Sequence, residues 1–576
     1  MLRGTAVSPG IARGTAFVIG CGRRAPAPRR TIPESEIEAE RRRFEDALGR
    51  AESELVALQR DVTGRIGPTH ADIFGAQALL VRDPTLHERV VSEIREKHVN
   101  AETALSELVD GQVRTLDGVP DPYIRERAAD LRDVGRRILS ALVERSGPDG
   151  IDLPDDAIVV AEELLPSVTA RIELGRAQGF VTERGSAYSH TSILARAMGT
   201  PAVAGIAGAA ERIRAGDRVI VDGLSGVVFV NPDRSVEREY ERLDGELCAH
   251  REDLRRLVEV PSVTLDGTAV PLLANVNKLA DTEAALLHGA DGVGLYRTEF
   301  QFTIRTSFPT EDDQCEFLSR AAERLHPRRM VLRLLDLGGD KVLPYFPLPP
   351  ARNPSLAQRG IGLLLEHPDL LKTQLRAFLR TSADHPVSIL LPVVRGVEDV
   401  RRAREVVKQA QRELAASGKR FDPGVRIGAM IEVPSAALVA RRLAREADFL
   451  SLGTNDLVQY VLAADREDDT VAASYQPLHP AVLGLLRSVA DAASEAGREL
   501  TLCGEIAGHP AYTALLLGLG LRAFSVAPGE LLEVKHAIRQ TRLEDARTLA
   551  SRALELGSIA EIEALVAGQA VPAAPA

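Results

Sequence analysis

Residues 426–456 read RIGAMIEVPSAALVARRLAREADFLSLGTND, and this stretch decides the fold. RIGAMIEV (426–433) and DFLSLGTND (448–456) are short apolar runs of the kind that form buried strands. The segment between them repeats apolar residues at helical spacing. Each strand run ends on polar residues, Glu432 in the first and Asp456 in the second. A strand, a helix and a further strand in this order predict one β/α unit of a parallel sheet.

The same unit recurs through the C-terminal half of the chain. Six more strand runs, each separated from the next by a helical pattern, are AVPLLANV (269–276), GVGLYRTEF (292–300), RRMVLRLLDL (328–337), SILLPVV (388–394), ELTLCGEI (499–506) and AFSVA (523–527). Strands alternating with helices in this way predict a (β/α)8 TIM barrel, whose chemistry sits at the C-terminal ends of its strands. Polar residues gather at those ends: Arg297, Glu299, Asp336, Glu432, Asn455, Asp456, Cys503 and Glu505.

The N-terminal half has a different pattern. Amphipathic helical periodicity fills the region from about residue 34 to 145, and short β-rich runs lie before and after it. We therefore predict a multidomain α/β protein. Its parts are an α/β domain of 1–22 plus 146–232, an inserted helical subdomain of 23–145, a linker helix of 233–260 and the barrel of 261–576.

Composition excludes several classes of protein. A chain of 576 residues exceeds one hydrophobic core, and about two to four domains are expected. The net charge of −11 argues against a nucleic-acid-binding protein. The four cysteines form no CxxC pair, which argues against a structural zinc site and a disulfide framework. Without a signal peptide or a membrane-length apolar run, the sequence favours a cytoplasmic protein with no membrane insertion.

The strand ends carry the residue types of a phosphate and metal site. Arg297 and Arg333 can each bind a phosphate or carboxylate through a forked guanidinium. Glu432 and Asp456 match the habit of Mg²⁺, which takes one or two protein carboxylates together with phosphate oxygens and water. Arg466, ten residues after Asp456, could close over the phosphate. The alternative is that these charges form ion pairs at the rim of the barrel.

Two further residues have both a chemical and a structural interpretation. Cys503 is either a buried small apolar residue or a proton donor in the barrel mouth. His190, in GSAYSHTSILARAMGTP, is predicted to lie at the start of a helix, where unpaired amides and the helix dipole favour an anion. A neutral imidazole there is either a nucleophile that accepts a phosphoryl group or a capping histidine.

Ordered motifs along the chain resemble one family. SPGIARG (8–14), IRERAADLRDVGRRIL, SHTSILAR, GVGLYRTEF, LDLGGDK, IEVPSAA, SLGTNDLVQY and LCGEIAG occur in this order. They are similar to the motifs of Enzyme I, the phosphoenolpyruvate–protein phosphotransferases of the bacterial phosphotransferase system, and they run along nearly the whole chain.

The resemblance implies a role for each matching residue. His190 would be phosphorylated through Nε2, Arg297, Arg333, Asn455, Asp456 and Arg466 would contact phosphoenolpyruvate, Glu432 and Asp456 would hold Mg²⁺, and Cys503 would protonate the enolate. It also implies that the α/β domain with the histidine swivels. The expected carrier is HPr, docking on the helical subdomain, and the expected assembly is a homodimer through the barrels.

The chain also departs from the family pattern. Ser186, Ala187 and Tyr188 stand where a second glycine is usual, Gly362 stands where arginine is common, and Ala357 replaces a glycine. Three alternatives are a nitrogen-type regulatory paralogue, a regulatory protein that binds phosphoenolpyruvate, and a pyruvate phosphate dikinase-like enzyme. The last needs an ATP-binding domain for which the first 260 residues leave no room.

Overall fold

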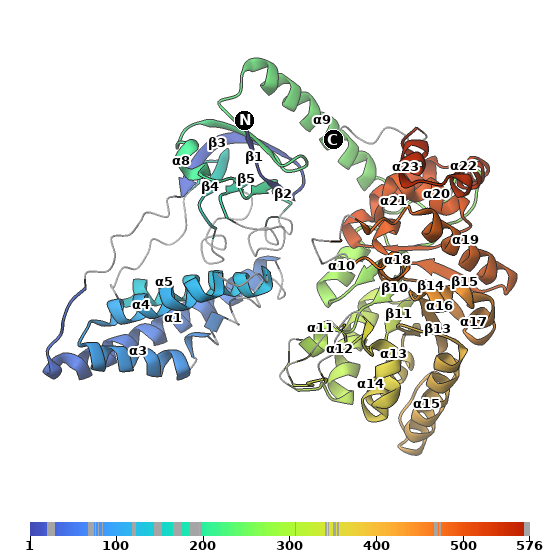
Figure 1. Ribbon diagram of the computed structural model, residues 1–576, viewed down its shortest axis with the longest axis horizontal. Coiled ribbons are helices and arrows are strands. Elements are labelled where there is room, and N and C mark those ends of the chain that lie inside the picture. The colour runs from blue at the N-terminus through green and yellow to red at the C-terminus, as the bar shows by residue number, and fades with distance from the viewer. Residues whose placement is uncertain are drawn as a thin grey trace. The chain divides into compact units, whose positions relative to one another are not determined.

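The computed structural model describes residues 1–19, 29–66, 74, 77–78, 80–82, 84–117, 122–142, 153–164, 176–184, 195, 199–303, 305, 307–339, 343, 345–349, 353, 356–465, 471 and 474–568. The chain forms two compact units that divide between Ala249 and His250. Figure 1 shows the elements of each unit.

The first unit contains a mixed sheet in the order β1-β8-β7-β3-β4-β5-β6-β2. Its strands are β1 (Leu2–Arg3), β2 (Thr5–Ser8), β3 (Ile11–Ile19), β4 (Ala157–Ala161), β5 (Ala177–Thr182), β6 (Ala202–Ala204), β7 (Arg218–Asp222) and β8 (Val227–Val230). β3 and β4 are parallel neighbours although more than a hundred residues separate them in the sequence. The α-helical region that follows β3 is therefore an insertion between adjacent strands.

The inserted region is helical, as its periodicity predicts. It contains α1 (Ile37–Ile66), α3 (Pro84–Lys97), α4 (Ala101–Asp117) and α5 (Pro122–Leu142). Their apolar faces share one core that includes Phe44, Leu55, Ile94, Leu105 and Ile138. The short helix α8 (Ala209–Arg212) lies in the α/β part, and α9 (Arg234–Arg255) is a long charged helix at the predicted linker.

The second unit is a closed barrel of parallel strands, which confirms the predicted (β/α)8 fold. The strands are β9 (Leu272–Val276), β10 (Val293–Tyr296), β11 (Met330–Arg333), β12 (Val387–Leu391), β13 (Arg426–Ile431), β14 (Phe449–Leu452), β15 (Glu499–Leu502) and β16 (Phe524–Val526). Seven of the eight lie within the predicted strand runs, β12 begins one residue before its run at 388–394, and several runs extend past the strand. β14 ends at Leu452, and the next helix begins at Thr454 with Gly453 as its N-cap, so Asn455 and Asp456 occupy the first turn of a helix.

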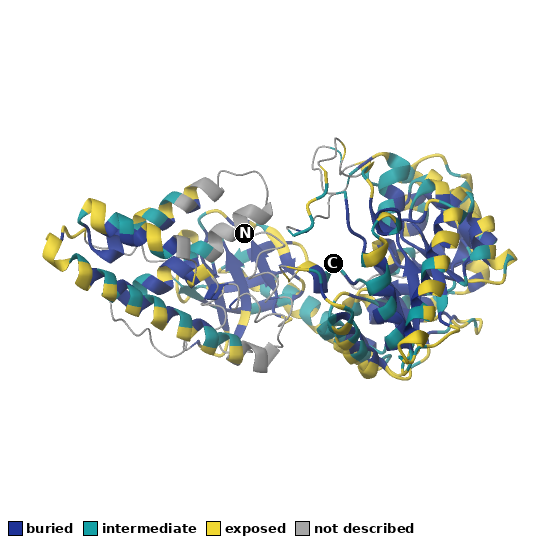
Figure 2. Cartoon of the chain, turned by 90° about the horizontal axis from the view of Figure 1, so that it is seen from below, coloured by how far each residue is buried: buried dark blue, intermediate teal, exposed yellow. Residues whose placement is uncertain are grey.

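Helices surround the barrel and cover its outer apolar face. They are α10 (Leu279–Leu287), α11 (Phe300–Thr303), α12 (Glu311–Leu325), α13 (Gly360–Glu366), α14 (Pro368–Ser382), α15 (Val397–Ala416), α16 (Pro434–Leu438), α17 (Ala440–Glu446), α18 (Thr454–Leu462), α19 (Pro480–Glu495), α20 (Thr513–Gly518), α21 (Leu531–Gln540), α22 (Leu543–Glu555) and α23 (Ile559–Ala567). Figure 2 shows buried residues concentrated in the strands and exposed residues on the outer helices.

The interior of the barrel is filled by side chains rather than open. Leu295, Val331, Leu390, Met430, Phe449 and Cys503 form a separate buried cluster there. Phe449 is the largest of them. Its ring fits because residue 428 is glycine, and a Cβ there would lie 2.3 Å from the ring. The guanidinium groups of Arg329 and Arg426 lie over the same ring, 5.9 and 5.3 Å from its centroid. The packed interior leaves the strand ends as the places where a ligand can bind.

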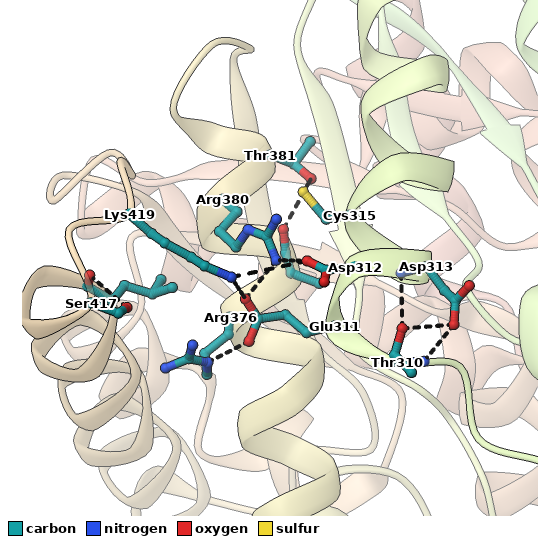
Figure 3. A network of polar contacts seen from close by, with 12 residues as sticks. Thr310, Glu311, Asp312, Asp313, Cys315, Arg376, Arg380, Thr381, Ser417 and Lys419 are labelled. Atoms are coloured by element: carbon teal, nitrogen blue, oxygen red, sulfur yellow. Dashed lines mark hydrogen bonds and ion pairs between the residues drawn. The ribbon is translucent and has the colours of Figure 1, made fainter.

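A network of ion pairs joins three outer helices of the barrel (Figure 3). Glu311, the first residue of α12, receives hydrogen bonds from Arg376 and Arg380 of α14, both at 2.6 Å, and from Lys419 just after α15 at 3.3 Å. Beside it, Thr310 and Asp313 cap the start of α12 through reciprocal hydrogen bonds. The network fixes the start of α12 against α14 and against the segment that follows α15. Within the part of the chain that the structure describes, no helix is long and apolar enough to cross a membrane.

Candidate active site

The candidate site is a cavity of about 350 Å³ at the C-terminal ends of the barrel strands. Each residue that the sequence places at a strand end follows its strand directly or within a few residues. The cavity brings together six of the eight predicted site residues, namely Arg297, Arg333, Glu432, Asn455, Asp456 and Cys503. His190 and Arg466, the other two, lie outside the described residues.

The two arginines of the cavity have different surroundings. Arg333 is buried, and its Nη2 donates a 2.7 Å hydrogen bond to Glu299 Oε1. Burial disfavours its charge, but Glu299, Asp336 and Glu432 outweigh that effect and raise the pKa of Arg333. Its Nε is buried and has no hydrogen-bond partner among the described residues. Arg297 is half-buried, and no described carboxylate pairs with it. Arg297 therefore presents unused donors to an anion, and Arg333 brings a buried positive charge to the cavity wall.

A third arginine, Arg359, was missed by the sequence analysis. It is buried, and it donates two hydrogen bonds to Asp336, from Nη2 at 2.8 Å and from Nε at 3.2 Å. Its Nη2 also lies 3.0 Å from Asp456 Oδ2. Arg359 belongs to the connection between β11 and α13, where no strand pattern marks a site. The local hint was its position immediately before the apolar helix that begins at Gly360.

The carboxylate of Glu432, directly after β13, lies between Val393 and Gly453. Val393 N–H donates a 2.6 Å hydrogen bond to Glu432 Oε1. Val393 has a φ of 51°, uncommon for a β-branched residue, and this turns its N–H toward the carboxylate. On the other side, a Cβ on Gly453 would lie 2.8 Å from Glu432 Oε2. The absence of a side chain at residue 453 therefore leaves room for this carboxylate.

The electrostatics of Glu432 fit a cation-binding role. Burial, together with the charges of Asp456 and Asp336, raises the pKa of Glu432 to about 7. The two neighbouring carboxylates thus add to burial in disfavouring a bare negative charge on Glu432, and a bound cation would offset both effects. Among the described residues no group of three or more His, Cys, Asp or Glu side chains forms a complete metal cage. Glu432 and Asp456 offer the two carboxylates that suffice for Mg²⁺ when phosphate oxygens and water complete its shell.

Cys503 forms part of the wall of the cavity. Its side chain is buried, and its Sγ lies 3.3 Å from Leu452 O and 3.3 Å from Ser451 Oγ. Burial raises the pKa of the thiol to about 11, so the group stays protonated near neutral pH. A protonated thiol at a cavity wall can donate a proton but is a poor nucleophile.

Asn455 is fixed by a reciprocal pair of hydrogen bonds. Its Nδ2 donates to Glu505 Oε1 at 2.7 Å, and its Oδ1 accepts from the N–H of Glu505 at 2.8 Å. Glu505 lies within the predicted strand run at 499–506, three residues after the end of β15, and is exposed. The pairing orients the Asn455 side chain at the rim of the cavity, so one predicted strand-end residue positions another.

Comparison with known proteins identifies the family. The PEP-binding domain of PEP-utilising enzymes matches residues 251–543, their N-terminal domain matches 3–127, and their mobile domain matches 153–226. The phosphoenolpyruvate-protein phosphotransferase of Haemophilus influenzae is 37% identical over 98% of this chain and 98% of its own length. That of Bacillus subtilis is 37% identical over 98% of this chain and 99% of its own. A solution structure of an Enzyme I (nEIt) protein is 35% identical and covers 43% of this chain and 99% of that one, with a TM-score of 0.36. The chain belongs to the PEP-utilising enzymes and, among them, to the family of phosphoenolpyruvate-protein phosphotransferases.

Proposed function

We propose that this chain transfers the phosphoryl group of phosphoenolpyruvate to its own His190 and then to a histidine of an HPr-type carrier protein, releasing pyruvate in the cytoplasm. The observation that carries the proposal is the cavity at the barrel mouth, where Arg297, with its unused donors, and the buried guanidinium of Arg333 lie beside the carboxylates of Glu432 and Asp456. Its chemistry matches a substrate with a phosphate and a carboxylate in one small molecule.

We assign substrate binding to Arg297 and Arg333, which have different roles. Arg297 lacks a described carboxylate partner, so an anionic substrate supplies its counter-charge. Arg333 is fixed by Glu299 and brings a buried positive charge to the cavity wall. Asn455 and, from outside the described residues, Arg466 complete the proposed contacts. This arrangement binds the phosphate and the carboxylate at defined points, which orients the phosphorus for attack.

Glu432 and Asp456 are the proposed ligands of Mg²⁺. When bound, Mg²⁺ would neutralise the charge of the phosphoryl oxygens during transfer. Other residues of the chain hold these two carboxylates in position. Val393 N–H and the space left by Gly453 hold Glu432, while Arg359 holds Asp456 through its Nη2.

The proposed transfer breaks the bond between phosphorus and the bridging enol oxygen. Nε2 of His190 attacks phosphorus, and the electron pair of the broken bond stays on the oxygen of the leaving enolate. Carbon 3 of the enolate then takes a proton, and we assign that proton to the thiol of Cys503, which lies at the cavity wall and is protonated. Ketonisation to pyruvate makes the transfer favourable. The histidine of the carrier next displaces His190 from phosphorus.

The proposed function includes two protein partners, the carrier and a second copy of the chain. The helices α1, α3, α4 and α5 supply the surface proposed for the carrier, and the barrel is proposed to pair with a second copy as a homodimer. Whether the pathway serves sugar uptake or regulation depends on the carrier rather than on the cavity.

A reconstituted relay tests the function. The full chain, phosphoenolpyruvate and Mg²⁺ are mixed with a purified HPr-type carrier, and both pyruvate and phosphohistidine on the carrier are measured. We expect one pyruvate for each carrier phosphorylated and no pyruvate beyond a single enzyme equivalent when the carrier is omitted. Continuous pyruvate release without a carrier would contradict the proposal, since it would show hydrolysis.

A further inference from the structure

A second cavity, of about 760 Å³, lies at the end of the barrel opposite the candidate site. Its walls include Ala269 and Pro271, which precede β9, Ala523, which precedes β16, and residues at the start of β15. Helices α19 and α22 complete it. Residues that precede parallel strands share the N-terminal end of the barrel, whereas the candidate site lies where the strands finish. Neither the family match nor the proposed function assigns a role to this cavity.

The walls of this cavity are strongly basic although the chain is acidic. They carry five arginines, at 329, 487, 498, 522 and 547, and two carboxylates, Asp491 and Glu499, in a protein of net charge −11. Both carboxylates are already paired. Asp491 accepts hydrogen bonds from Arg487 Nε at 2.9 Å, and Glu499 accepts from Arg329 at 2.9 Å and lies 3.0 Å from Arg426. The excess positive charge of the wall is therefore not cancelled within it.

Three arginines of the wall pair with no carboxylate among the described residues, namely Arg498, whose Nε donates to Ala444 O, and the neighbouring Arg522 and Arg547. Arg522 follows α20 and Arg547 lies on α22, and the close packing of these two helices brings the two arginines together. At the contact, a Cβ on Gly518 of α20 would lie 1.9 Å from Ala546 O of α22. Arg522 is half-buried, and its Nη1 is anchored by the carbonyl oxygens of Leu517 at 2.6 Å and Leu521 at 2.7 Å. Its remaining N–H groups are left for a ligand.

The arginines of this wall lie close enough to act on one another electrostatically. Burial lowers the pKa of Arg522, and the positive charges of Arg547 and then Arg487 lower it further, while Asp266 opposes them with a smaller effect. Asp266 itself is already bonded to Thr264 and to the N–H of Leu543. Arg522 caps α20 through its hydrogen bonds to the carbonyl oxygens at the helix end, which accounts for an arginine at residue 522. That role does not account for the nearby guanidinium groups of Arg487 and Arg547.

We propose that this cavity binds a small phosphorylated metabolite, whose dianionic phosphate is held between Arg487, Arg522 and Arg547. Guanidinium forks match phosphate oxygens in geometry and stay charged at all physiological pH values. The cavity has the volume of a typical small-molecule site, roughly 300–1,000 Å³. A dianion between these three arginines relieves their mutual repulsion, so the site favours phosphate over a single carboxylate.

Calorimetry with inorganic pyrophosphate as the probe tests the proposal on the full chain without Mg²⁺. We expect one saturable site per chain in the wild type. Arg547→Ala, an exposed position where the fold should be unaffected, is expected to weaken binding about tenfold or more, as is Arg522→Ala. Arg552→Ala is the matched control, because Arg552 is an exposed arginine of the same helix that does not line the cavity, and its affinity should equal the wild type.

Three results would overturn the proposal: no saturable binding, equal weakening by Arg552→Ala, or equal affinity for acetate, a single carboxylate, which would remove the preference for phosphate. Arg297→Ala distinguishes the two ends of the barrel, because Arg297 lines the candidate active site and has no carboxylate partner among the described residues. If it abolished pyrophosphate binding, the anion would be at the candidate active site and the second cavity would lose its assignment. If it left that binding unchanged while the KM for phosphoenolpyruvate rose, both proposals would stand.

Discussion

Arg297 and Arg333 line the same cavity, but what surrounds them gives their substitution different consequences. Arg333 is buried against Glu299 and Asp336, so its removal takes the paired cation from Glu299 and leaves Asp336 with Arg359 alone, which costs about 3–5 kcal/mol of stability. Arg297 has no such partner among the described residues. Its loss removes a donor for the substrate and little else. Arg297 is therefore the better residue for separating binding from folding.

Arg297→Ala should raise the KM for phosphoenolpyruvate about tenfold or more, because the substrate loses a charge-assisted contact. Steady-state pyruvate release measures the KM, and thermal unfolding should show a Tm equal to that of the wild type. Arg320→Ala, at an exposed position on α12, is the control and should change neither quantity. An unchanged KM in Arg297→Ala would remove Arg297 from the substrate contacts.

Gly453→Ala tests the space beside the proposed metal ligand. A Cβ at residue 453 would lie 2.8 Å from Glu432 Oε2 and 3.0 Å from Glu432 Cβ, so the carboxylate must move. We expect the Mg²⁺ concentration for half-maximal turnover to rise about tenfold. Gly484→Ala, in α19 with open space at its Cβ, is the control and should leave the Mg²⁺ requirement unchanged. An unaltered requirement in Gly453→Ala would argue that Glu432 does not hold the metal.

Cys503→Ala tests the proton donor. The buried thiol contacts Leu452 O and Ser451 Oγ and is not an anchor for the substrate, so kcat should fall about a hundredfold while KM changes little. Stopped-flow release of pyruvate, compared with the rate of His190 phosphorylation, should show that protonation is the slowed step. Normal turnover would return Cys503 to the role of a small buried residue of the barrel interior.

The residues at strand ends were predictable from sequence because strand runs mark their own ends. Arg297, Glu432 and Cys503 each follow an apolar run, and parallel strands in a barrel deliver such residues to one face. Arg359 was not predictable in this way. It reaches Asp336 and Asp456 from a connection without strand character, and that approach depends on how the connection folds over the barrel mouth.

At the scale of elements, side-chain charges determine how the outer helices are held. Glu311 at the start of α12 accepts hydrogen bonds from Arg376 and Arg380 of α14 and from Lys419 beyond α15. These residues lie far apart in the sequence, so periodicity predicted the helices but not the network. Burial opposes the charge of Glu311, yet the arginines outweigh it and lower the pKa of its carboxyl group.

Glu311→Gln should lower the free energy of unfolding by about 1–2 kcal/mol at neutral pH, because partly buried cations lose their partner. A carboxyl with a lowered folded-state pKa stabilises the fold above its unfolded pKa and loses that effect as the pH falls through the folded value. The difference between wild type and variant should therefore shrink in acid. Denaturant unfolding at several pH values measures it. Glu316→Gln, at an exposed position of α12, is the control, and an equal loss there would rule out the network as the cause.

The barrel itself was predictable because its signal repeats. Eight apolar runs alternate with helical patterns, and each coincides with one strand of the closed barrel. Exact ends were less predictable. β12 begins at Val387, one residue before its run, and the run at 448–456 continues past β14 into α18, because the apolar pattern alone marks no boundary.

At the scale of the whole molecule, the chemistry is divided between two compact units. His190 belongs by sequence to Met1–Ala249, and the cavity proposed for phosphoenolpyruvate belongs to His250–Ala573. Transfer requires Nε2 of His190 to come within contact of the phosphorus, so the histidine must reach the barrel mouth during the reaction. The barrel carries a second basic cavity at its other end, which separates the proposed anion site from the site of transfer.

The central claim is that phosphoenolpyruvate phosphorylates His190, and labelling of the full chain tests it most directly. The protein is incubated with Mg²⁺ and phosphoenolpyruvate labelled in its phosphoryl group, and the bound label is treated with acid and with base. We predict an acid-labile, base-stable label on the wild type, with none on His190→Ala and normal labelling of His98→Ala as the control. Label that persists on His190→Ala, or that survives acid, would contradict the account.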